Sequence, residues 1–181
     1  MSEAVGALDA LGELLANGVL AWGLAACGVA QLSKLVIELV VHRRWRPAVL
    51  VETGGMPSSH SALMTGTAAG LGWELGFADP LFALAAVLCF VVLYDASGVR
   101  RAAGLMAQRV NGLPDGLWDT QAEEGGSSSE PVLRPLKENL GHTRTEVLVG
   151  SVMGPLVALP GLALLGSPWQ IAQGAGWLPL G

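Results

Sequence analysis

Two histidines, each at the start of a hydrophobic segment, have neighbours that could support chemistry on a phosphate. His60 follows the turn of residues 54–59, which is rich in glycine and serine, and His142 follows Gly141. Glu146 stands four residues after His142, one helical turn on. An imidazole backed by a carboxylate, with hydroxyl groups, backbone N–H groups and cations around it, has the groups needed for phosphoryl transfer through a phosphohistidine. We therefore take His60, His142 and Glu146 as candidate catalytic residues.

The composition indicates that these residues belong to a membrane protein. Of the 181 residues, 51% are hydrophobic and 14% are charged, whereas a soluble domain has about 25% charged residues. Mean hydropathy is +0.50, and six residues are Trp, which favours membrane interfaces. The net charge of −5 gives no basic footprint for a nucleic acid, so no nucleic-acid partner is expected. Cys27 and Cys89 lie far apart in apolar runs and are expected to be buried thiols.

Several apolar runs approach the length of about 20 residues that crosses a bilayer. The predicted spans cover residues 14–41, 60–75, 81–94 and 145–165, and the third continues as a helix to residue 111. A short helix is expected over 133–140, a mobile cytoplasmic linker over 112–131 and an interfacial tail over 167–181. We expect an all-α integral membrane bundle of about four transmembrane helices with short interfacial helices, in a single domain over residues 1–181. Because so few helices share the core, a homodimer is a possible assembly.

The distribution of charge gives the expected orientation. All ten Lys and Arg residues lie at the junction of the first two spans or between the third and fourth. With four spans, both regions share one face, which also holds His42, His60 and His142. The positive-inside rule places this face in the cytoplasm and both termini on the opposite side.

Several motifs resemble a known family. Pro57-Ser58-Ser59-His60 is similar to the Pro-Ser-Gly-His element of the phosphatidic-acid-phosphatase type 2 superfamily, which includes vanadium-dependent haloperoxidases. The stretch from His142 to Glu146 resembles the His-x-x-x-Asp element of that superfamily. The divergent membrane branch, described as acid phosphatase/vanadium-dependent haloperoxidase-related, is closer still. That likeness extends over residues 31–34, 52–62, 94–104 and 136–143, and in all it covers most of residues 14–165.

The resemblance implies a metal-independent phosphatase with no cofactor, acting on a lipid or isoprenoid phosphate monoester or diphosphate among membrane lipids. By analogy, His142 would attack phosphorus, Glu146 would orient its imidazole and stabilise its positive charge, and His60 would protonate the leaving oxygen. The expected phosphate-binding residues are Ser58, Ser59, Lys34, Arg100, Arg101 and Lys137. The expected structural or orienting residues are Asp95, Gly54, Gly55 and Pro57.

The chain departs from the superfamily pattern in its cations. Arg46 precedes a proline as in the superfamily, but Leu39 stands where a lysine is usual, seven residues earlier. Residues 135–136 are Pro-Leu in the register of the usual Ser-Arg. The acid is Glu146 rather than Asp, and Ser59 replaces Gly. The two histidines are therefore present without the usual arginine clamp, and cations elsewhere in the chain could replace it.

Other interpretations stay open. A catalytically inactive protein of the same fold could bind or transport a phospholipid or phosphate, or act as an assembly subunit. The pairs His142–Glu146 and Lys34–Glu38 could each be an ordinary intrahelical pair worth about 0.2–0.5 kcal/mol. Asp95 and its neighbouring arginines could form an interfacial ion-pair cluster. A metal-dependent variant is a smaller alternative, for which His60, Asp95, Glu138, His142 and Glu146 could offer ligands. No spacing of these residues is a specific metal signature, so the leading interpretation has no metal.

Overall fold

The structure, a computed structural model, describes residues 10–50, 54–113, 136–138 and 140–177. Within these ranges the chain is helical and has no strand, which confirms the all-α expectation. The elements are α2 (Gly18–Val40), the 3-10 turn η1 (Pro47–Leu50), α3 (Ser59–Leu75), α4 (Pro80–Ser97), α5 (Val99–Asn111), α6 (Arg144–Leu165) and α7 (Pro168–Gly174). A further helical segment covers residues 10–16.

Polar residues at the predicted turns begin the helices. The side chain of Asn17 accepts a hydrogen bond from the Leu20 N–H at the start of α2, at 2.9 Å. Asp79 caps α4 in a similar way, Ser58 caps α3 and Thr143 caps α6. Each cap satisfies N–H groups that have no partner within their own helix. Because the caps stand where the apolar runs begin, α3 and α6 start within a residue of the predicted spans 60–75 and 145–165.

Three details differ from the expectation. The first predicted span began at residue 14, but the helix is interrupted at Asn17, whose extended backbone caps α2. The third span and its extension form two helices, α4 and α5, which meet at Gly98. The short helix predicted over 133–140 is absent from its described part: residues 136–138 and 140 are irregular, and the Leu136 N–H donates to the side chain of Asn111 instead of to a helical carbonyl. Residues 114–131 of the predicted linker lie outside the described residues.

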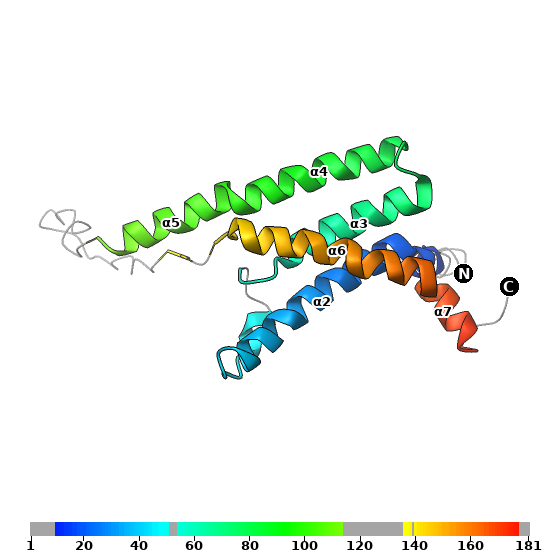
Figure 1. Ribbon diagram of the computed structural model, residues 1–181, viewed down its shortest axis with the longest axis horizontal. Helices are drawn as coiled ribbons and strands as arrows, with labels where there is room; N and C mark the ends of the chain where they lie inside the picture. Colours follow the sequence, from blue (N-terminus) through cyan, green and yellow to red (C-terminus); the bar gives the residue numbers. More distant parts are fainter. Residues whose placement is uncertain (1–9, 51–53, 114–135, 139, 178–181) are drawn as a thin grey trace, which may run out of the picture.

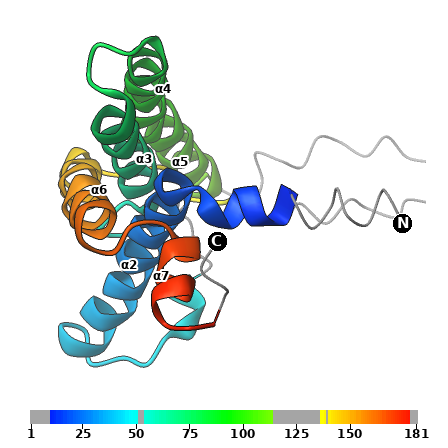
Figure 2. The ribbon, with the colours of Figure 1, turned by 90° about the vertical axis from the view of Figure 1, so that its right-hand side faces the viewer.

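In the part of the chain that the structure describes, three helical stretches are long and apolar enough to cross a membrane: α2, α4 together with α5, and α6. Large apolar side chains on α4 lie exposed on the outside of the bundle, among them Val87 and Phe90. Such a continuous apolar surface is typical of a helix that faces lipid. The shorter α3, with 17 residues, packs against α2, α4 and α6 (Figures 1 and 2). The protein is therefore a multi-pass membrane protein with α3 at its centre.

Glycine allows α3 and α6 to approach until their backbones touch. A Cβ atom on Gly154 would meet the Ala62 carbonyl and, at 2.6 Å, the Gly66 nitrogen. One turn earlier, a Cβ on Gly150 would meet the Ser58 carbonyl. Small residues four apart are the usual means of such close packing in membranes, where apolar burial gives no preference for protein over lipid. We call this contact the glycine interface.

The chain reverses direction from α2 to α3, to α4 and to α6. The C-terminal ends of α2 and α4 and the N-terminal ends of α3 and α6 consequently gather at one end of the bundle (Figure 1). The described basic residues belong to these ends, to α5 or to the segments beside them, so the predicted shared basic face is present. Both histidine motifs open helices at this end.

Candidate functional site

Glu146 is tied to both the helix start and the imidazole of His142. Its Oε2 accepts from the Thr143 N–H at 3.0 Å and from Nδ1 of His142 at 3.1 Å. The Thr143 hydroxyl in turn accepts from the Glu146 N–H at 3.2 Å, which completes a capping box. His142 is buried, with 4% of its surface exposed. A carboxylate on Nδ1 holds the proton there and leaves Nε2 with its lone pair.

The second histidine lies beside the first. The ring centroids of His60 and His142 are 6.3 Å apart, and the rings are tilted by 59°. His60 is exposed whereas His142 is buried, so the pair is reached from the His60 side. His142, Arg100 and Lys34 all lie within electrostatic range of the His60 imidazole. The structure thus brings together the two motifs that the sequence keeps 82 residues apart (142 − 60).

The glycine interface fixes how the two histidine-bearing helix starts meet. With Gly150 against the backbone of Ser58, the Ser58 N–H donates to the Glu146 carbonyl at 3.1 Å. The Ser58 side chain accepts from the Ser61 N–H and hydroxyl, the latter at 2.9 Å. Ser58 is fully buried and Ser59 has 4% exposure. The N–H of Ser58 therefore donates inside the protein and its hydroxyl oxygen accepts two bonds there, so its predicted contact with phosphate through the N–H would require the bond to Glu146 to be broken.

A connector, which we define as residues 136–138 and 140–143, runs along α5 toward His142. The Asn111 side chain at the end of α5 donates to the Leu136 carbonyl and to the Glu138 carboxylate, both at 2.8 Å, and accepts from the Leu136 N–H at 2.9 Å. The His142 N–H donates to the Ala96 carbonyl of α4 at 2.9 Å. The connector is thus fastened at both ends, which places His142 relative to α4 and α5.

Two glycines let the connector lie against α5. A Cβ on Gly104 would come within 2.6 Å of the Glu138 carbonyl and 2.8 Å of the Leu140 carbonyl. Gly141 has a φ of +78°, and a Cβ there would meet the backbone of Arg100 and Arg101. Any larger residue at either position would push the connector away from the helix.

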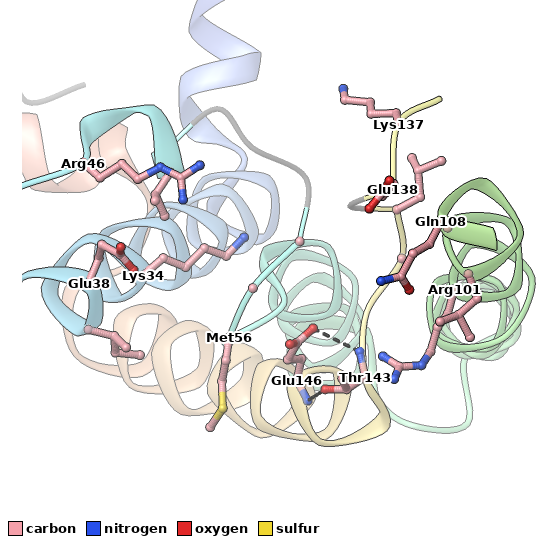
Figure 3. A pocket seen from close by; sticks show the side chains of 18 of the residues that line it. Lys34, Glu38, Arg46, Met56, Arg101, Gln108, Lys137, Glu138, Thr143 and Glu146 are labelled. Carbon is pink, nitrogen blue, oxygen red and sulfur yellow. Dashed lines mark hydrogen bonds between the residues drawn. The ribbon is translucent and has the colours of Figure 1, made fainter. Parts of the chain in front are cut away.

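A cavity of about 660 Å³ opens beside Glu146 (Figure 3). One wall is α2 with Lys34 and Glu38, followed by His42 just beyond its end, and the opposite wall is α5 and the connector. The residues that line it from those elements are Arg101, Gly104, Leu105, Gln108, Lys137, Glu138, Leu140 and Gly141. Thr143, Glu146 and the loop of residues 54–56 also line it. Neither histidine of the pair is among its lining residues.

The predicted phosphate-binding cations divide into two groups. Lys34, Arg101 and Lys137 line the cavity. Arg100 does not; its Nε donates to the Asp95 carboxylate at 2.6 Å, on the His60 side. The ion-pair interpretation is therefore right for Asp95 and Arg100. Lys34 and Glu38 form no ion pair, since Glu38 lies 4.0 Å from His42 instead.

The predicted orienting residues just before His60 are either buried or line the cavity. Pro57 is buried beneath the turn, and Gly54 and Gly55 line the cavity with positive φ angles of 134° and 79°. This conformation suits glycine and lets the loop turn into Ser58. Among the described residues, no three His, Cys, Asp or Glu side chains gather closely enough to hold a metal ion.

The sequence analysis did not single out Asn111, Gln108 or Gly104 as site residues. Asn111 and Gly104 hold the connector, and Gln108 lines the cavity. The only sequence signal was the spacing of Arg101, Gly104, Leu105 and Gln108, which fall on one face of a helix. That face could be recognised as functional only once the connector was seen to lie against it.

Comparison with known proteins agrees with the motifs. The model of the Divergent PAP2 family matches residues 15–157. A relative from Bacillus subtilis (strain 168), described as "Uncharacterized membrane protein YuiD", is 38% identical over 150 residues, which are 81% of this chain and 95% of the relative. No solved structure matches. Since the matched range contains both histidine motifs, the cavity and the glycine interface, the chain belongs to the Divergent PAP2 family.

Proposed function

We propose that the protein is a membrane-embedded phosphatase that hydrolyses a lipid or isoprenoid phosphate, either a monoester or a diphosphate, through a phosphohistidine. The observation that carries the proposal is the histidine pair: His60 stands 6.3 Å from His142, whose Nδ1 is held by Glu146. Membership of a PAP2-related family supports it. The catalytic residues of the proposal are His142, His60 and Glu146.

In the first half-reaction, Nε2 of His142 attacks phosphorus. The N–P bond forms while the P–O bond to the leaving group breaks. The leaving group is the lipid alcohol of a monoester or, for a diphosphate, the phosphate that stays attached to the lipid. His60 in its protonated form gives a proton to the departing oxygen. Glu146 stabilises the positive charge that develops on the His142 imidazole, as the carboxylate does in other nucleophile–base pairs.

The second half-reaction restores the enzyme. Water attacks the phosphorus of the phosphohistidine, and the now neutral His60 takes a proton from that water. The N–P bond breaks, its electron pair returns to Nε2 of His142, and inorganic phosphate leaves. The exposed position of His60 supports this role, because water reaches the pair from that side.

The location of the site supports a lipid substrate. The pair lies at the basic end of a bundle whose α4 surface is apolar, so a tail can lie in the bilayer while the phosphate reaches the rim. The positive-inside rule places this end in the cytoplasm, with both termini opposite. Labelling of single cysteines by an impermeant maleimide, at position 44 for the basic end and at position 177 for the other, would test the orientation in cells.

The central experiment is phosphate release by the purified protein in detergent. Substrates would be phosphatidate, phosphatidylglycerol phosphate and prenyl phosphates, with EDTA and with vanadate in parallel. We expect release that persists in EDTA, is inhibited by vanadate because vanadate mimics the pentacoordinate transition state, and disappears in His142→Ala. A labelled substrate should leave acid-labile label on the wild type and none on His142→Ala.

Glu74→Gln, on α3 near the opposite end of the bundle, is a control and should keep wild-type activity. Equal release by wild type and a folded His142→Ala would show that another residue is the nucleophile. Absence of release from every substrate by a folded wild-type protein would overturn the proposal.

One observation favours the alternative of a phosphate-binding protein without turnover. The N–H of Ser58 is engaged inside the protein, and the usual arginine clamp is absent. Under that alternative a lipid phosphate raises the thermal unfolding midpoint of the wild type but is recovered intact. The release assay and the recovery of the ligand separate the two functions.

A further inference from the structure

The cavity beside Glu146 is lined by four basic side chains, Lys34, Arg46, Arg101 and Lys137, and by three acids. Each of its three acids is already engaged. Glu38 faces His42, Glu138 accepts from Asn111, and Glu146 accepts from Thr143 and His142.

Three of the four cations that line the cavity have no such partners, whereas the fourth, Arg46, has an interaction of its own. Among the described residues, Lys34, Arg101 and Lys137 make no hydrogen bond or ion pair. Lys34 is the least exposed of the three, with 4% of its surface exposed, and it has no hydrogen-bond acceptor among the described residues. Its stem is buried while its ammonium reaches the cavity, where it can contact an anion.

The position of Lys34 on α2 directs it into the cavity. Ala26 and Ala30 precede it at four-residue intervals and are fully buried in the core, while Glu38 follows on the same face and lines the cavity. Figure 3 shows Lys34 reaching toward Glu146 from α2, with Arg101 opposite on α5. An anion between the two walls would be contacted from both.

The size of the cavity exceeds what one phosphate needs. Its volume of about 660 Å³ lies within the range of small-molecule sites, about 300–1,000 Å³. The phosphoryl group under attack must sit at Nε2 of His142, and neither His142 nor His60 lines the cavity. Lys34, Arg101 and Lys137 therefore remain for another part of the ligand.

We propose that the cavity binds a second anionic group of the substrate, so that the substrate carries two phosphates: a diphosphate, or a phosphomonoester joined to a phosphodiester. Arg101 and Lys137 hold the second phosphate, and Lys34 lies between it and the group under attack. The inference rests on the proposed function for the reaction itself, but binding of a second phosphate can be measured without turnover.

Matched substrates test the inference. Prenyl diphosphate is compared with the prenyl monophosphate of the same chain length, and phosphatidylglycerol phosphate with phosphatidate. The variant combines Arg101→Met with Lys137→Met, which keeps length and removes charge. We expect KM for the two-phosphate member of one pair to rise at least tenfold, and kcat/KM for the single-phosphate member to change less than twofold. A response in the prenyl pair would show that the second phosphate is part of a diphosphate. A response in the other pair would show that it is part of a phosphodiester.

A binding measurement makes the test independent of activity. Inorganic pyrophosphate should raise the thermal unfolding midpoint of His142→Ala more than orthophosphate does at equal concentration. This difference should disappear when Arg101→Met and Lys137→Met are added. Arg109→Met, on α5 but outside the cavity lining, is the matched control and should behave as the parent.

The outcomes distinguish the two ideas. Pyrophosphate binding that depends on Arg101 and Lys137, without hydrolysis of any substrate, would leave the cavity site standing and overturn the proposed phosphatase. Hydrolysis with equal effects of the double variant on both members of each pair, and no preference for pyrophosphate, would overturn the second-anion site and leave the phosphatase standing.

Discussion

The glycine interface and the cavity, which both adjoin Glu146, are built in opposite ways. The glycine interface joins α3 and α6 backbone to backbone, and the contact at Gly150 and Gly154 leaves no room for a side chain. At the cavity, α2 faces α5 and the connector, and long polar side chains line the space between them. Different parts of the molecule therefore position the histidines and supply the charges around the cavity. The histidines are placed by backbone contacts, whereas the charges of the cavity are carried on side chains that can be exchanged without moving a helix.

The largest expected effect comes from opening the glycine interface. In Gly154→Val, the new side chain would overlap the backbone of α3, which cannot move aside as a flexible side chain would. Overpacking a well-packed contact costs about 1–3 kcal/mol, and we expect at least that loss in the free energy of unfolding, together with loss of phosphate release. Thermal unfolding in detergent and the release assay measure both.

Gly28→Ala is the control for helix glycines, because a Cβ on Gly28 meets nothing within 4 Å. It should change stability by less than about 1 kcal/mol. If the Gly28 and Gly154 variants proved equally stable, the close approach of α3 and α6 would not hold the site together.

The second-largest effect is expected from Glu146→Gln, a variant that separates the chemical role of Glu146 from its structural role. In Glu146→Gln, the amide can still complete the capping box with Thr143, so thermal stability should stay near wild type. The negative charge beside His142 is lost, and kcat should fall by about 100-fold or more with little change in KM. Steady-state kinetics check this, with Glu74→Gln as the charge-matched control. A Glu146→Gln enzyme with full kcat would show that the carboxylate only caps α6.

A smaller effect is expected from loosening the connector. Asn111→Ala removes three hydrogen bonds to Leu136 and Glu138, all of them exposed. His142 stays fastened at the Ala96 carbonyl, so the expected loss is about tenfold in kcat, the scale of a modest misplacement of a reacting group. Arg109→Ala on the same helix should keep wild-type kcat. Rescue of kcat by Asn111→Asp, which keeps the acceptor for the Leu136 N–H, would show that the connector is positioned through its backbone; equal kcat in Asn111→Ala and wild type would contradict this role.

The smallest effect is expected at the exposed ion pair. Asp95→Asn releases Arg100, whose side chain is 60% exposed. Exposed pairs contribute about 0–1 kcal/mol, so the unfolding midpoint should scarcely move. Because Arg100 lies within electrostatic range of His60, kcat/KM should change by no more than about threefold, and raising the salt concentration should reduce that change. A tenfold loss that persists at high salt would show that Asp95 contributes more than an exposed ion pair.

Much of the fold could be predicted because its determinants are local. The apolar runs and the caps at Asn17, Ser58, Asp79 and Thr143 fix where helices begin, and each acts within a few residues. The segment before His142 could not be predicted in this way. The Leu136 N–H of this segment donates to the side chain of Asn111, which lies 25 residues earlier, and no local sequence pattern indicates that partner.

The sequence by itself determined the membrane class, the helix starts, the gathering of basic charge and the two histidine motifs. These features depend only on composition or on residues that are close to one another in the sequence. The tertiary structure alone decided that His60 and His142 meet across the glycine interface. It also decided that the cations divide, with Arg100 beside the pair and Lys34, Arg101 and Lys137 around the cavity. The physical reason is that helix formation depends on neighbours in sequence, whereas the distance between two side chains on different helices depends on how closely the backbones pack, which only the folded bundle sets.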